Sequence, residues 1–175
     1  MSKINKAVIA KLKPCKDRFD NYLKHYSDFN GKVEEFIMLE NITYSDKVWV
    51  MTKLMTKRQN VKWALACASR WLSIFESRYP YDLRPRKALE AAEAWLNNPS
   101  SENRVKARAD AYNAFTAAAA ADAARAAADA AALSAYAAAT ASAYAGIAAA
   151  DVAALSARAT EQEVNLILMV DVLNE

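Results

Sequence analysis

Apolar residues recur along most of the chain at the three- and four-residue spacings of an amphipathic helix. The longest such pattern in the first half covers residues 58–79, where two adjacent stripes form a wide, mostly apolar face. A face of that width indicates contact with more than one neighbouring helix. The whole chain has only two Gly and four Pro, so little interrupts these patterns. The sequence therefore predicts an all-α fold, and its 175 residues fit a single domain.

Turn and capping residues indicate where the expected helices begin and end. Pro14 and Pro85 suit the first turn of a helix, and Ser45 suits the N-cap position. Asn30-Gly31 and Tyr79-Pro80 should each end a helix. The expected helices cover residues 2–12, 14–30, 32–39, 45–55, 58–79 and 85–97, after which Ser100 or Ser101 caps the next helix.

Residues 107–159 contain 31 alanines among 53 positions, one glycine (Gly146) and no proline. Alanine is the best helix former, and its small side chain lets helix backbones approach closely. We therefore expect the alanine-rich second half, residues 100–159, to form the tightly packed centre of the domain. An unbroken helix from 101 to 145 would be about 68 Å long. Because a domain of this size is more compact than that, we expect a break near residues 118–121 and another at Gly146.

Two other interpretations of the alanine-rich stretch are rejected. Residues 130–150 carry no charge, but alanine contributes little energy to membrane insertion, so we expect no membrane span. The larger side chains do not recur at a fixed long period, so the stretch is not a repeat array. They trace one helical face instead: Leu133, Tyr136, Thr140, Tyr144 and Ile147. A last helix should carry Val164, Ile167, Leu168 and Val170, with an interruption at Thr160.

Charge is distributed unevenly along the chain. Residues 1–87 carry 18 Lys and Arg against 9 Asp and Glu, whereas residues 88–175 carry 5 against 11. A basic first half is compatible with a nucleic-acid-binding accessory protein. The candidate contacts for that alternative are Lys53, Lys57, Arg58 and Lys62, with a second group at Lys11, Lys13, Lys16 and Arg18. Docking of the basic half against the acidic half explains the same charges.

Catalytic and cofactor motifs are missing from the sequence. It has no glycine-rich phosphate loop and no metal-ligand spacing, and its single histidine, His25, has no catalytic partner nearby in sequence. Cys15 and Cys67 are far apart and suggest neither a disulfide framework nor a zinc site. Unpaired thiols suit a reducing cytoplasm. We therefore expect a cytoplasmic protein that is not an enzyme and needs no cofactor or metal.

The segment from Asp82 to Trp95, DLRPRKALEAAEAW, followed by alanine-rich helices, resembles an alanine-rich immunity protein family of bacteria and phages. The similarity covers about residues 63–150. It implies an all-helical, non-enzymatic protein that neutralises a toxin by binding it. Many relatives have histidines in the alanine-rich tract, whereas this sequence has none there, which argues against a metal or pH role at that place.

The turn between the two helices around Pro80 and Pro85 is the candidate partner-binding site. Binding hot spots favour Trp, Tyr and Arg, which gives Tyr79, Tyr81, Arg84 and Arg86 as the contacts for a toxin or defence protein. In the structural alternative, the two arginines pair with Asp82, Glu90 or Glu76 and fasten the helices together. Arg70, on the 58–79 stripe, should be partly buried and paired, and Asp122, Arg125 and Asp129 should form an ion-pair triad. A third hypothesis is a purely structural subunit of a homo-oligomer.

Overall fold

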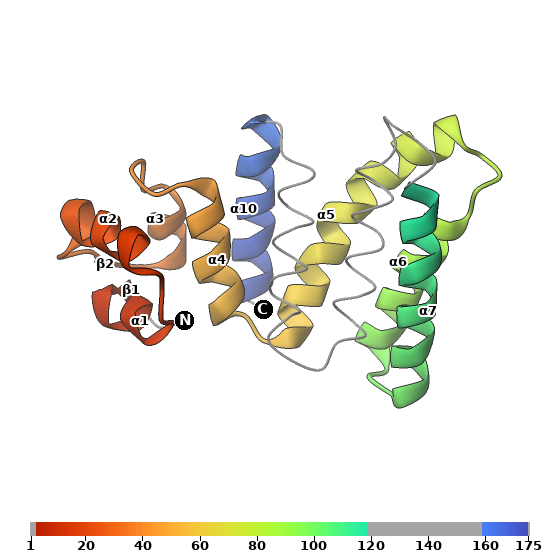
Figure 1. Ribbon diagram of the computed structural model, residues 1–175, viewed down its shortest axis with the longest axis horizontal. Coiled ribbons are helices and arrows are strands. Elements are labelled where there is room, and N and C mark those ends of the chain that lie inside the picture. Colours follow the sequence, from red (N-terminus) through yellow and green to blue (C-terminus); the bar gives the residue numbers. More distant parts are fainter. Residues whose placement is uncertain (1–2, 119–158, 175) are drawn as a thin grey trace.

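The computed structural model describes residues 3–118 and 159–174. Within them it has eight helices and two strands of two residues each, so the all-α prediction is confirmed. The strands are β1 (Ile4–Asn5) and β2 (Asn30–Gly31), which pair antiparallel with Ile4 opposite Gly31. Figure 1 shows the helices side by side in a row, with the strands and the shortest helices at one end.

The amino-terminal end of this row contains α1 (Lys6–Lys11), α2 (Lys16–Tyr26), α3 (Val33–Ile37) and α4 (Tyr44–Leu54). Four expectations about helix ends fail here. Ile4 lies in β1, because Asn5 caps α1 by accepting hydrogen bonds from the backbone of Ala7 and Val8. Pro14 precedes the N-cap of α2. α2 ends at Tyr26, and Asn30 and Gly31 form β2. Thr43 caps α4 in place of Ser45.

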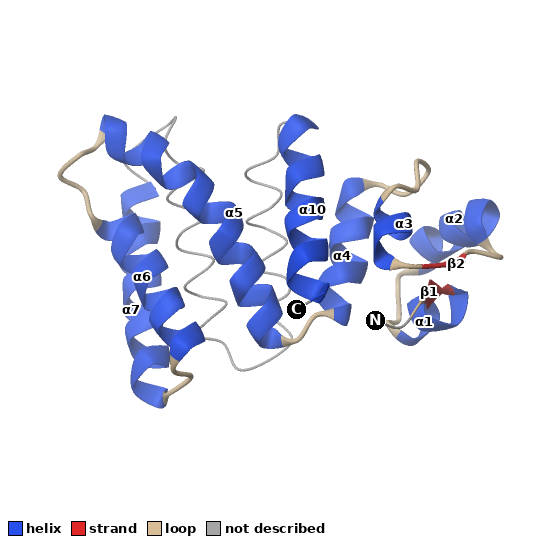
Figure 2. Cartoon of the chain, turned by 180° about the vertical axis from the view of Figure 1, so that it is seen from behind, coloured by secondary structure: helices blue, strands red, loops and turns tan. Residues whose placement is uncertain are grey.

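The remaining helices are α5 (Lys57–Arg78), α6 (Arg84–Asn97), α7 (Ser101–Ala118) and α10 (Ala159–Asn174). Their order in space differs from their order in the chain, because α10 lies between α4 and α5 (Figure 1). Figure 2 shows the same order from behind, with the α6–α7 hairpin at the far end. Thr160 lies in the first turn of α10 and does not interrupt it.

Helix α10 joins the two ends of the row through buried polar contacts. The indole nitrogen of Trp63 on α5 donates to the backbone carbonyl of Asn165 at 2.9 Å. The Asn165 amide lies 3.5 Å from the hydroxyl of Tyr44 on α4, and burial raises the pKa of Tyr44 to about 12. Two further bonds hold the carboxyl-terminal part of α10: Gln59 to the carbonyl of Val172, and Asn174 to Glu34.

The core follows from this arrangement. Its largest fully buried side chains come from the first part of the chain and from α10: Trp63, Phe36, Phe75, Ile4, Met51 and Met169. Alanines dominate the α6–α7 contact, where Ala88, Ala91 and Ala92 of α6 and Ala107, Ala111 and Ala114 of α7 are buried. This agrees with close packing at the start of the alanine-rich stretch. Its expected centre, the breaks at 118–121 and Gly146, the stripe over 133–147 and the 122–129 triad lie outside the described residues.

Two features are absent from the described part of the chain. None of its helices combines the length and the hydropathy of a membrane-spanning segment. Residues 3–118 and 159–174 also hold no cluster of three His, Cys, Asp or Glu side chains that could bind a metal ion. Cys15 is exposed and Cys67 is buried.

Candidate partner-binding site

The turn between α5 and α6 forms because each helix has a defined end there. The Tyr79 backbone N–H donates to the Phe75 carbonyl at 2.8 Å as the last bond of α5, and Pro80 follows. The Tyr79 and Phe75 rings have centroids 5.2 Å apart, so Tyr79 is half-buried against its own helix. Asp82 closes the turn by donating its N–H to the Tyr79 carbonyl. Pro85 then lies in the first turn of α6, as predicted.

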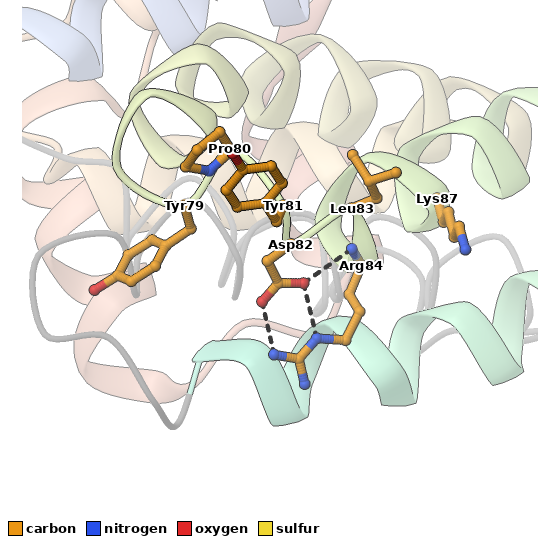
Figure 3. A pocket seen from close by; sticks show the side chains of 7 residues that line it. All are labelled: Tyr79, Pro80, Tyr81, Asp82, Leu83, Arg84 and Lys87. Atoms are coloured by element: carbon orange, nitrogen blue, oxygen red, sulfur yellow. Dashed lines mark hydrogen bonds and ion pairs between the residues drawn. The ribbon is translucent and has the colours of Figure 1, made fainter.

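A shallow hollow of about 690 Å³ opens at this turn (Figure 3). Its lining comprises Tyr79, Pro80, Tyr81, Asp82, Leu83, Arg84 and Lys87. Tyr81 is 97% exposed and Leu83 is 47% exposed, and both line the hollow. The hollow therefore presents aromatic and aliphatic surface next to charged groups.

Arg84 and Asp82 form one wall of the hollow. The Arg84 Nε and Nη2 atoms donate to the two carboxylate oxygens of Asp82 at 2.8 and 2.6 Å, and the Arg84 backbone N–H also donates to Oδ1 (Figure 3). The side-chain hydrogen bonds from Arg84 hold the pKa of Asp82 below its usual value, although burial acts in the opposite direction. The same pairing raises the pKa of Arg84. Asp82 is thus ionised and neutralised by its neighbour.

Arg86 points to the other helix. Its Nε and Nη2 atoms donate to the two carboxylate oxygens of Glu76 on α5, both at 2.6 Å. This fork-to-fork geometry is the strong form of an arginine–carboxylate pair. The contact ties α5 to α6, as the structural alternative for the arginines expects. Arg86 does not line the hollow, where Leu83 and Lys87 join the predicted Tyr79, Tyr81 and Arg84.

The basic residues at the join of α4 and α5 are only partly available to a polyanion. The Lys57 ammonium lies 4.5 Å from the centroid of the Trp95 ring, and burial lowers the pKa of Lys57. Arg58 donates to the Leu96 carbonyl near the carboxyl-terminal end of α6, where a cation is favourable. Lys53 and Lys62 are exposed. Two of the four candidate residues for nucleic acid thus hold α5 against α6.

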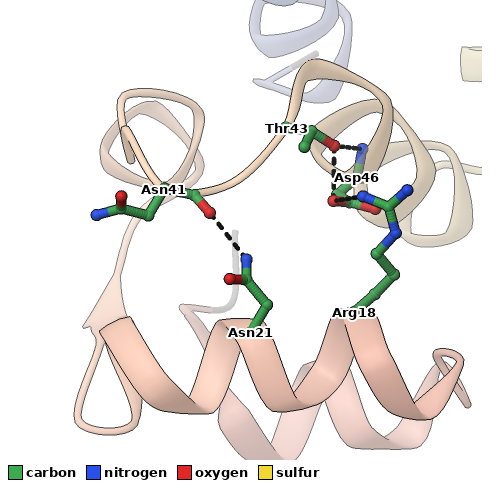
Figure 4. A network of polar contacts seen from close by, with 5 residues as sticks. All are labelled: Arg18, Asn21, Asn41, Thr43 and Asp46. Atoms are coloured by element: carbon green, nitrogen blue, oxygen red, sulfur yellow. Dashed lines mark hydrogen bonds and ion pairs between the residues drawn. The ribbon is translucent and has the colours of Figure 1, made fainter.

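The second basic group is similarly divided. Arg18 on α2 pairs with Asp46 of α4 at 3.0 Å, and Asp46 also accepts from the Thr43 hydroxyl (Figure 4). In the same network Asn21 donates to the Asn41 carbonyl, which joins α2 to the segment before α4. Lys16 pairs with Asp20 one turn along α2. Lys11 and Lys13 are exposed.

Some side chains differ in exposure from what their sequence pattern predicted, and other exposed residues belong to no pattern by which they could be predicted. Arg70 is exposed rather than partly buried, because the buried part of α5 passes through Trp63, Ala64, Cys67 and Ala68. His25 is exposed at the end of α2, next to the Tyr26 ring. Leu83 was missed because it stands between two charged residues and belongs to no periodic pattern. Val105 and Tyr112 on α7 are also strongly exposed, which a periodic pattern alone does not distinguish from burial.

Comparison with known proteins gives a family match that contains α5, α6 and α7 and parts of α4 and α10. Residues 51–167, two thirds of the chain, match the family model described as Imm-5 like putative immunity protein. The matched range includes the hollow between α5 and α6 and extends past both ends of the similarity expected from the sequence. No curated protein and no solved structure matches the chain. By its family match, this chain belongs to the Imm-5 like putative immunity protein family.

Proposed function

We propose that the protein is a non-enzymatic immunity-type protein that neutralises a toxin, or a host or defence protein, by binding it directly. Membership of the immunity protein family carries this proposal. Cys15 and Cys67 are far apart in the sequence and suggest no disulfide framework, which fits a reducing cytoplasm as the place of action. The partner is a protein surface, and the function requires no cofactor or metal ion.

The hollow at the α5–α6 turn is the proposed contact with that protein. Tyr81 and Leu83 provide exposed apolar surface, and tyrosine is one of the side chains that most often anchor an interface. Tyr79 supports them from the end of α5. Arg84 is held in a fixed orientation by Asp82, so little conformational freedom is lost if it contacts a partner. Arg86 acts more indirectly, by fixing α6 to α5 through Glu76.

The experiment begins with the partner and then tests the surface. The tagged protein is recovered from its native host, the bound protein is identified by mass spectrometry, and the purified pair is studied by calorimetry and by rescue of growth. Tyr81→Ala combined with Leu83→Ala should weaken binding at least tenfold and leave the melting temperature unchanged, since Leu and Ala are equally poor at the N-cap position of α6. The matched control is Met38→Ala, which removes another strongly exposed apolar side chain (74%) after α3. Equal binding by both variants would exclude the hollow as the contact.

The arginines need a separate comparison, because both are in ion pairs. If they contact the partner, Arg84→Ala/Arg86→Ala weakens binding while the fold's stability barely changes. If they only fasten the helices, stability falls first and binding falls with the unfolded fraction. A double variant that is stable and binds normally would remove both residues from the site.

Nucleic-acid binding by Lys53, Lys57, Arg58 and Lys62 remains the alternative function. A salt titration separates the two, because release of counterions from a nucleic acid makes affinity fall steeply with salt. Lys53→Ala/Lys62→Ala should reduce that slope if these lysines contact phosphates, and should leave protein binding unchanged if the proposed function is right.

A further inference from the structure

Helix α7 is the outer helix of the row and has two different faces. It pairs with α6 as an antiparallel hairpin joined through residues 98–100, and no other described helix lies beyond it (Figures 1 and 2). Its inner face is buried through Ala107, Ala111 and Ala114, as the packing against α6 requires. The opposite face remains exposed.

The exposed face has the spacing of a helix-pairing seam. Glu102, Val105, Ala109 and Tyr112 are all exposed and follow one another at intervals of three, four and three residues. Val105 is 66% exposed and Tyr112 is 70% exposed. A three–four spacing with apolar residues is the pattern by which one helix packs along another. Large apolar side chains that share an exposed stripe are typical of an interaction surface.

Unpaired positive charge lies along one side of this seam. Arg104 and Arg108 lie one turn apart on one flank, both exposed, and neither forms an ion pair with another described residue. On the other flank Lys106 is bonded to Asp110 of the same helix at 2.6 Å. The seam thus has one strongly cationic border and one border without an acidic excess.

We propose that the outer face of α7 binds an amphipathic helix of the protein partner, whose apolar stripe covers Val105 and Tyr112 and whose acidic flank faces Arg104 and Arg108. This inference rests on the proposed function and adds the shape and charge of the partner. A second copy of the chain fits less well. In an antiparallel pair of α7 helices the arginine borders face each other, and in a parallel pair they face Lys106. Asp110 is already paired with Lys106, and Glu102 lies within the seam, so neither arrangement places an unpaired acidic flank opposite the arginines.

The outer face of α7 also adds contact area to that of the hollow. A specific interface buries about 800 Å² of each partner, more than the exposed parts of Tyr81 and Leu83 offer. Because α6 and α7 are antiparallel, the carboxyl-terminal end of α7 lies at the same end of the hairpin as the hollow (Figure 3). A partner helix along α7 would extend the contact from that end.

Two synthetic helical peptides test the inference on the full-length protein. They share one leucine seam and differ only in their flanks, which are glutamate in one and lysine in the other. Binding is measured by calorimetry and by fluorescence anisotropy. The native protein should bind the glutamate peptide about tenfold more tightly than the lysine peptide, and Arg104→Glu/Arg108→Glu should reverse the preference. Lys11→Glu/Lys13→Glu, which reverses two exposed charges on and beside α1, is the matched control and should keep the native preference.

The seam itself is tested by Val105→Ser/Tyr112→Ser, which should abolish binding of both peptides while the circular dichroism spectrum and melting temperature stay the same. The inference is wrong if the native protein binds neither peptide or both equally. It is also wrong if the native chain is a dimer that these serines dissociate, because a second copy would then cover the seam. A partner toxin bound normally by the Arg104→Glu/Arg108→Glu variant would overturn this inference alone. An intact charge preference in a chain that neutralises no toxin would overturn the proposed function alone.

Discussion

The indole N–H of Trp63 donates to the backbone carbonyl of Asn165 at 2.9 Å, although the two residues are 102 positions apart in the chain. Both residues are essentially inaccessible to water, with exposures of 0% and 1%. The Asn165 carbonyl lies within α10 and keeps its helical partner, so losing the indole donor costs about one buried hydrogen bond, roughly 1 kcal/mol. This contact therefore couples α5 to α10 and makes the centre of the row sensitive to either partner.

Replacing Trp63 by Phe should lower the free energy of unfolding by about 2–4 kcal/mol, because it removes the hydrogen bond and leaves a cavity. Urea denaturation followed by circular dichroism measures the change. Trp49→Phe is the control, since Trp49 is only half-buried. If both substitutions lowered the free energy of unfolding equally, the buried contact of Trp63 would contribute no more than that of a half-buried tryptophan.

Ala107→Leu should destabilise the protein by about 1–3 kcal/mol, because the larger side chain forces α7 away from α6. Ala109→Leu, two residues along the same helix but on its exposed face, should have almost no effect. The difference between the two variants isolates packing from helix propensity. A protein that tolerates Ala107→Leu as well as Ala109→Leu would have no tight α6–α7 contact. The same substitution at Ala131, Ala135, Ala138 and Ala139 tests whether close packing continues along the stretch.

The Asp82–Arg84 pair makes a prediction for acid. Because Arg84 lowers the pKa of Asp82 in the folded protein, the pair's contribution to stability is complete above the unfolded value of about 3.9. It is lost as the pH falls through the lower folded value. Carboxyl NMR titration of Arg84→Ala should return the pKa of Asp82 towards its ordinary value. The stability difference between native protein and variant should then vanish in strong acid, and a difference that persists there would disprove the assignment.

Tyr22 is 3% exposed, and its hydroxyl is buried without a hydrogen-bond partner among the described residues. Burial accordingly raises the pKa of the phenol. Tyr22→Phe should raise the free energy of unfolding by about 1 kcal/mol, because it removes an unsatisfied polar group. Tyr26→Phe should lower it by a similar amount, since the Tyr26 hydroxyl accepts from Asn41. Thermal melts of the two variants should move in opposite directions.

Local chemistry explains which helices were predictable from the sequence. Tyr79-Pro80 and Pro85 bracket the α5–α6 turn, since proline restricts its own backbone and that of the preceding residue. Val33, Phe36 and Ile37 gave the short α3 correctly. Thr43 and Ser45 are chemically similar caps, but Asp46 stands three residues after Thr43 and exchanges hydrogen bonds with it. This spacing is a local signal for Thr43 that the choice of Ser45 overlooked, whereas the Arg18–Asp46 pair spans 28 residues and has no local pattern.

The site was predictable only in part, for a similar reason. Tyr79, Tyr81 and Arg84 could be chosen by residue type, and the hollow contains all three. The contacts of Lys57 with Trp95 and of Arg58 with Leu96 required the fold, because each joins residues 38 positions apart. Likewise, the position of α10 between α4 and α5 depends on which apolar faces remain uncovered once all the helices are present.

Because α10 lies between α4 and α5, the order in which the helices are synthesised differs from the order in which they pack side by side. A ribosome adds about 5–20 residues per second, so Asn165 is made roughly 5–20 s after Trp63. During that interval the apolar side of α5 that α10 covers must wait for its partner. The nascent chain therefore exposes a hydrophobic, tryptophan-bearing face for seconds, which is long enough for a chaperone to bind it.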